Sequence, residues 1–137
     1  MDPTTREALR RVLLGDAQSL VLLQKHPQDE LFDGFSGTDL IIGHEAVARV
    51  LHGIEKREID GATAQRWASF VRRGYVAGKG NRLPLKPLSI EYEPSYEDQI
   101  AEILSRLDEI GDLVDGDVPG TEKICEFLAS LGFADDA

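Results

Sequence analysis

Apolar residues recur at helical spacing over most of the chain, which predicts a protein built mainly from α-helices. The first helix is expected to begin at Thr4 or Thr5, whose hydroxyl can accept an amide hydrogen bond. A second apolar segment, Leu20–Leu23, should be helical to about Lys25, because Pro27 disfavours helix at the residue before it. The first helix has an apolar face formed by Ala8, Leu9, Val12 and Leu13.

The middle of the chain predicts a loop followed by a core helix. Residues 27–37 contain a proline, two glycines and several polar residues, so we expect a loop here. The loop is expected to be pinned to the core by Leu31, Phe32 and Phe35. Thr38 or Asp39 then caps a helix that continues to about Lys56. The apolar face of this helix consists of Leu40, Val47, Val50, Leu51 and Ile54.

A turn at Asp60-Gly61 precedes the next predicted helix, which Thr63 can cap and which ends near Gly74. Its apolar positions are Ala64, Trp67, Ala68 and Val71. Residues 77–94 are rich in proline and glycine, so we predict an extended segment that crosses the helices. Within it, residues 88–92 alternate between apolar and polar, as in a short strand or an extended crossing.

The most regular helix is predicted after Ser95, which forms a capping box with Asp98. Its apolar seam is Tyr96, Ile100, Ile103, Leu107, Ile110 and Val114. A last helix covers about residues 121–131, with Ile124, Phe127, Leu128 and Leu131 inward. The predicted fold is therefore a single mainly α domain, residues 1–137, in which about five helices form a bundle around the extended segment 77–94.

Composition fits one globular domain: the chain has 137 residues, of which 42% are hydrophobic and 29% charged. The longest apolar run has four residues, far short of the roughly 20 that span a membrane. The amino terminus lacks the pattern of a secretory signal, and the single cysteine, Cys125, suits a reducing compartment. We therefore expect a cytoplasmic protein.

Charge is distributed unevenly along the chain. From Glu91 onward there are 14 acidic and two basic residues, which gives this part a net charge of −12, whereas the whole chain has a net charge of −10. Residues 61–90 contain no carboxylate and six cationic residues. The acidic balance disfavours nucleic acid as a partner, because phosphate repels a negatively charged surface.

Residues 105–118 carry five carboxylates, so this segment could form either a calcium loop or an acidic helix. If Gly116 is the sixth position of a calcium loop, two of the first three ligand positions hold Gly111 and Leu113, which rules against calcium. On the helical interpretation the carboxylates point outward. We predict that they bind a basic partner; the predicted partner-binding residues are Asp108, Glu109, Asp112, Asp115 and Asp117. The alternative is internal pairing with Arg66, Arg72, Arg73 or Lys86.

Spacing of the remaining reactive residues favours no metal, cofactor or catalytic site. His44-Glu45 resembles the start of a zinc-hydrolase helix, which requires a second histidine four residues after the first. That position holds Ala48 instead. His52 lies eight residues from His44, and Cys125 has no clear histidine partner. Trp67 and Phe70 are at core spacing rather than on a nucleic-acid stacking surface.

The turn and helix start in residues 59–68, with its Trp67-Ala68 pair, resembles a segment of small bacterial proteins. Some similar short acidic helical proteins are immunity proteins of bacterial toxin systems. The resemblance implies an acidic surface that blocks a basic nuclease toxin. Our first hypothesis is a non-catalytic immunity- or antitoxin-like inhibitor of a basic protein. The second is a small enzyme whose site combines distant residues, such as His44 and Glu45 with Arg72 or Arg73. The third is a helical scaffold or homodimer subunit.

Overall fold

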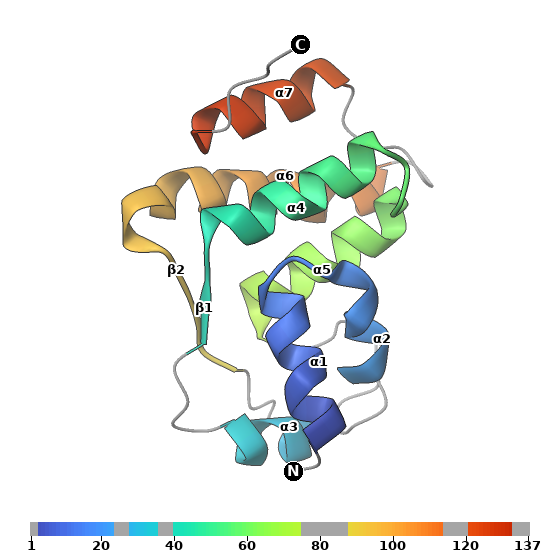
Figure 1. The fold of residues 1–137 in the computed structure, drawn as a ribbon, viewed down its shortest axis with the longest axis vertical. Helices are drawn as coiled ribbons and strands as arrows, with labels where there is room; N and C mark the ends of the chain where they lie inside the picture. Colours follow the sequence, from blue (N-terminus) through green and yellow to red (C-terminus); the bar gives the residue numbers. More distant parts are fainter. Residues whose placement is uncertain (1–2, 24–27, 36–39, 75–87, 114–120, 133–137) are drawn as a thin grey trace.

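The fold, known from a computed structural model, consists of packed helices with a two-stranded sheet on one flank (Figure 1). The structure describes residues 3–23, 28–35, 40–74, 88–113 and 121–132; the side chains of residues 28–30, 109–113, 121–123 and 125 lie outside this description. Seven α-helices and two strands occur in the described residues, so the prediction of a mainly α fold is confirmed.

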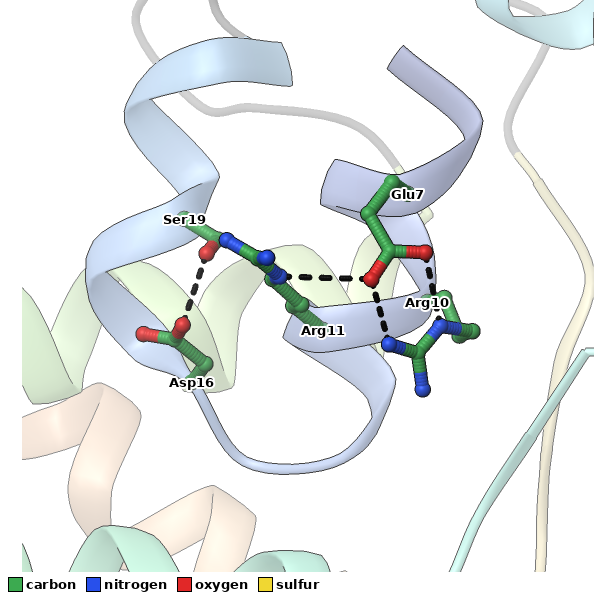
Figure 2. A network of polar contacts seen from close by, with 5 residues as sticks. All are labelled: Glu7, Arg10, Arg11, Asp16 and Ser19. Atoms are coloured by element: carbon green, nitrogen blue, oxygen red, sulfur yellow. Dashed lines mark hydrogen bonds and ion pairs between the residues drawn. The ribbon is translucent and has the colours of Figure 1, made fainter. Parts of the chain in front are cut away.

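The first helix, α1 (Pro3–Leu13), follows the predicted pattern, with Ala8, Leu9 and Val12 buried. A short 3-10 turn, η1 (Ala17–Ser19), leads into α2 (Leu20–Leu23). Figure 2 shows Glu7 between Arg10 and Arg11 on the outer face of α1, and the Asp16 carboxylate accepting a hydrogen bond from Ser19 Oγ at 2.8 Å. The contacts of Glu7 lie on the solvent side of α1, whereas Ser19 is buried and its contact with Asp16 is only partly exposed. The apolar face of α1 enters the core.

Two predictions for the next segment are wrong. Residues expected in a loop form α3 (Gln28–Phe35), which buries Leu31 and Phe35. These two residues are four apart and therefore share one helix face, a spacing that outweighs Gly34 near the helix end. Leu40 does not begin a helix, because it belongs to the strand β1 (Leu40–Ile42), where Ile41 is exposed and its two neighbours are buried. The alternation identifies a half-buried strand.

The core helices α4 (His44–Glu55) and α5 (Gly61–Arg73) bury the apolar faces that the sequence predicts. Their caps differ from the prediction. Asp60, not Thr63, caps α5, since its carboxylate accepts a hydrogen bond from the Thr63 amide at 2.8 Å. Gly74 ends α5 with φ of +81°, and a Cβ there would lie 2.1 Å from the Leu88 carbonyl oxygen. Only glycine therefore permits the chain before β2 to approach the end of α5.

A second strand, β2 (Ile90–Tyr92), pairs with β1 in parallel, with Leu40 opposite Ile90 and Ile42 opposite Tyr92. The possible strand at residues 88–92 is thus observed, whereas residues 77–87 of the predicted extended segment lie outside the described residues. The sheet joins two junctions that are far apart in sequence: β1 leads into α4, and β2 leads into α6.

The longest helix, α6 (Glu97–Leu113), begins after a 3-10 turn, η2 (Pro94–Tyr96). Ser95 lies inside that turn, so it does not start the helix as the predicted capping box requires. The seam is confirmed at Ile100, Ile103 and Leu107, which are buried, while the side chain of Ile110 and all of Val114 lie outside the described part. The last helix, α7 (Thr121–Ser130), packs mainly on α4.

Trp67 of α5 occupies the centre of the core with none of its surface exposed. Its indole Nε1 donates a hydrogen bond to the Val12 carbonyl oxygen at 2.8 Å, so α5 and the end of α1 are joined by a buried polar contact. The interpretation of Trp67 and Phe70 as core residues is confirmed. Within the described residues, no helix is long and apolar enough to cross a membrane.

Candidate functional site

The first acidic residue of the predicted binding face, Asp108, is buried between α5 and α6 and is only 4% exposed. Its Oδ2 accepts a hydrogen bond from Arg72 Nη1 at 2.6 Å and lies 3.6 Å from Arg73 Nη2. Gln65 Nε2 donates to Oδ1 at 3.1 Å. Three side chains of α5 therefore hold one carboxylate of α6.

This geometry corrects the prediction that Asp108 points outward, and it favours the alternative of internal pairing for this residue. Helical spacing places Asp108 one position after Leu107 and four after Leu104, both buried, so it lies at the edge of the apolar face. A carboxylate removed from water there needs charged and hydrogen-bonding partners. The long arginine side chains supply them while remaining partly exposed.

The other predicted partner-binding residues are not tested by the structure. Glu109 and Asp112 lie in α6, but their side chains are outside the described part, as are Asp115 and Asp117 entirely. Their assignment to a binding face stays a prediction.

A second group of carboxylates, which the sequence reasoning did not single out, lies from β2 to the first half of α6. Its members are exposed, and none has an ion-pair partner among the described residues; we call them the β2–α6 carboxylates: Glu91, Glu97, Asp98 and Glu102. Between Leu88 and Asp108 the sequence has a single basic residue, Arg106. That imbalance is visible in the sequence and is the signal that could have identified them.

Glu93, in the same region, has an internal role. Its Oε1 accepts a hydrogen bond from the His44 backbone amide at 2.9 Å and lies 2.6 Å from His44 Nδ1. It therefore caps α4, whose own N-cap, Gly43, has no side chain to do so. Hydrogen bonding by His44 holds the pKa of the Glu93 carboxyl below its usual range.

The His44 ring also stacks on Tyr96, with 4.1 Å between ring centroids and 22° between the ring planes. A histidine, a carboxylate and a phenol thus meet where β1 enters α4 and β2 enters α6. A histidine held by a carboxylate is an arrangement that general acid–base catalysis also uses. The partner of His44 is Glu93, 49 residues away, rather than the adjacent Glu45, which is exposed.

Metal-ligating residues do not cluster in the described part of the chain: no group of three or more histidine, cysteine, aspartate or glutamate side chains is arranged to hold an ion there. One hollow over described residues follows α4 and is lined by charged side chains around Ala48 and Gly53. No protein-family model, curated protein or solved structure matches the chain.

Proposed function

We propose that this chain is a non-catalytic binding protein whose acidic surface docks on a basic protein. The observation that supports it is that, among the described residues, some carboxylates between β2 and the middle of α6 are paired within the chain and others are not. Glu93 and Asp108 have partners within the chain, whereas the β2–α6 carboxylates are exposed with no ion-pair partner among the described residues. The surface therefore offers negative charge that no cationic side chain among the described residues balances.

The dipole of α6 explains the position of only some of these carboxylates. Glu97 and Asp98 lie in the first turn of α6, where the helix dipole favours anions. Glu102 lies beyond that turn and four residues after Asp98, a like-charge spacing that costs a helix about 0.2–0.5 kcal/mol. A basic surface over these residues would relieve the repulsion and speed encounter by electrostatic steering.

In its most specific form the proposal is an immunity- or antitoxin-like inhibitor of a basic protein, acting in the cytoplasm. The resemblance of residues 59–68 to small bacterial proteins supports this form, as does the acidic balance after Glu91. The remaining predicted binding residues, Glu109, Asp112, Asp115 and Asp117, would extend the same acidic surface toward the end of α6 and beyond.

The proposal is tested by neutralising charge where it is unpaired. The triple variant Glu97→Gln, Asp98→Asn, Glu102→Gln should bind poly-L-lysine about three- to one-hundred-fold more weakly, from three exposed pairs. Its unfolding free energy should fall by no more than about 1–2 kcal/mol, because the lost interaction of Glu97 and Asp98 with the helix dipole is partly offset by relief of the repulsion between Asp98 and Glu102. Fluorescence titration at two salt concentrations and urea denaturation measure the two quantities.

The matched control removes three carboxylates elsewhere: Glu45→Gln, Glu55→Gln, Glu58→Gln. Net charge changes equally, so an equal loss of binding in both triple variants would mean that only total charge matters, and the proposed surface would be wrong. Destabilisation of the first triple variant by clearly more than about 2 kcal/mol, the most that the helix dipole accounts for, would likewise contradict it.

A small enzyme is the second candidate, and the contact of His44 with Glu93 and Tyr96 favours it. Hydrolysis of simple ester or phosphoester substrates that is lost in both His44→Gln and Glu93→Gln, with the fold retained, would support this candidate over the first.

A further inference from the structure

The Asp108 cluster, which consists of Asp108 with Gln65, Arg72 and Arg73, contains more N–H donors than its carboxylate uses. Arg72 donates to Asp108 Oδ2 through Nη1 alone, while Gln65 donates to Oδ1. Arg72 therefore does not form the two-bond fork that arginine commonly makes with a carboxylate. A guanidinium has five N–H groups, and the others of Arg72 have no acceptor among the described residues.

Arg73 makes even less use of the carboxylate. Its Nη2 lies 3.6 Å from Asp108 Oδ2, which is too far for a hydrogen bond. No other carboxylate in the described part of the chain forms an ion pair with Arg72 or Arg73. The side chains of the two arginines are 38% and 47% exposed, so an anion in solution can reach their free donors.

The charges of the Asp108 cluster do not cancel. Two guanidinium groups approach one carboxylate oxygen, which leaves a surplus of one positive charge. The dipole of α5 favours cations in its last turn, where both arginines lie, but it does not remove the repulsion between them. Residues 61–90 contain no carboxylate that could do so. A second anion, bound between the two guanidinium groups, would relieve this repulsion.

Tyr92 of β2 lies in the electric field of the same arginines. The Leu88 amide donates a hydrogen bond to the Gly74 carbonyl at 2.9 Å, so the chain enters β2 beside the end of α5. Burial raises the pKa of the Tyr92 phenol, and the positive charge of Arg72 acts in the opposite direction. The phenol therefore keeps its proton at neutral pH and remains a hydrogen-bond donor near Arg72.

We propose that Arg72 and Arg73 bind a phosphate group, either as the free ion or as a monoester. Phosphate has oxygens enough to accept from both guanidinium forks, and at neutral pH it carries about −1.5 to −2 charges. A carboxylate offers only two oxygens and one charge. Asp108 and Gln65 are positioning residues, because they hold Arg72 through the carboxylate. The inference does not depend on the proposed function, which uses other residues.

Titration with sodium phosphate at about pH 7.5 and constant ionic strength tests the proposal, with calorimetry for affinity and NMR of the arginine Nε–H groups for location. The wild-type chain should bind one phosphate with a Kd on the order of 1 mM. Arg73→Gln should weaken binding about tenfold or more. Arg72→Lys keeps the charge beside Asp108 but loses the fork, so it should weaken binding about three- to tenfold.

Arg66→Gln is the matched control, since it removes one exposed arginine from the same helix and should leave the affinity unchanged. Circular dichroism checks the fold of each variant, and Arg73→Lys is a milder change if Arg73→Gln unfolds the chain. Phenyl phosphate distinguishes the two sources: tighter binding than inorganic phosphate indicates a phosphorylated molecule, and weaker binding indicates the free ion.

Three results would overturn the proposal. The first is the absence of saturable binding up to about 50 mM phosphate. The second is binding of acetate as tight as that of phosphate, which would show that the arginines do not select a phosphate group. The third is a loss of affinity in Arg66→Gln equal to that in Arg73→Gln, which would show that only total charge matters.

Discussion

At the scale of a single residue, Arg57 adopts a left-handed backbone conformation where the chain leaves α4. It has φ of 60°, and no other non-glycine residue in the described part has a positive φ. The chain leaves α4 here through two hydrogen bonds, from the Glu58 amide to the Gly53 carbonyl at 2.8 Å and from the Arg57 amide to the Ile54 carbonyl at 3.1 Å. This pattern normally places glycine at the left-handed position, because a Cβ there is crowded.

Replacing Arg57 with glycine should therefore stabilise the protein. The relief of left-handed strain exceeds the extra entropy of an unfolded glycine, and the net gain should be about 0.5–1 kcal/mol. Urea denaturation measures it, with Lys56→Gly as the control, since Lys56 has φ of −84° and gains nothing from glycine. No gain in Arg57→Gly would mean that the arginine side chain makes contacts worth as much as the strain.

Between elements, the pair of α5 and α6 is the most extensive contact of the fold, and the Asp108 cluster lies in it. The two partners differ in exposure: the Asp108 side chain is 5% exposed, and that of Arg72 is 38% exposed. Loss of the arginine leaves a buried carboxylate, whereas loss of the carboxylate leaves an arginine that water can reach. The two changes should not be equivalent.

Arg72→Met should thus cost about 3 kcal/mol of unfolding free energy, and Asp108→Asn about 1–2 kcal/mol, since asparagine retains the contact with Gln65. A double-mutant cycle should show coupling of about 1–3 kcal/mol. Arg66→Met is the control on the same helix, because Arg66 is exposed and its change should stay within about 0.5 kcal/mol. Additive effects of the two substitutions would show that the pair contributes no coupling energy.

At the scale of the whole molecule, several carboxyl groups make the stability of the fold depend on pH in the acidic range. Hydrogen bonding by His44 lowers the pKa of Glu93, hydrogen bonding by Arg10 lowers that of Glu7 to about 2, and hydrogen bonding by Thr63 lowers that of Asp60. The unfolded chain then binds more protons than the folded one at acidic pH. The stability from these groups is complete above the unfolded pKa values of about 4 and is lost as pH falls through the folded values.

Glu93→Gln separates one contribution from the others. Glutamine retains an oxygen acceptor for the His44 amide but does not titrate, so the variant should lose less stability than the wild type between about pH 5 and pH 2. Thermal melts over this range measure the difference, with Glu102→Gln as the matched control. Parallel pH profiles for the Glu93 variant and the wild type would contradict the linkage to His44.

Local sequence determined the helical class, the apolar faces of α1, α4 and α5, and the seam of α6, because each depends on spacing within one element. Tertiary structure decided the rest. Leu40 pairs in a strand only because Ile90 lies beside it, 50 positions away. Glu93 caps α4, and Asp108 turns from solvent to Arg72, because burial makes a distant partner necessary. Periodicity places a residue on a face, but the neighbour across that face determines what its charge does.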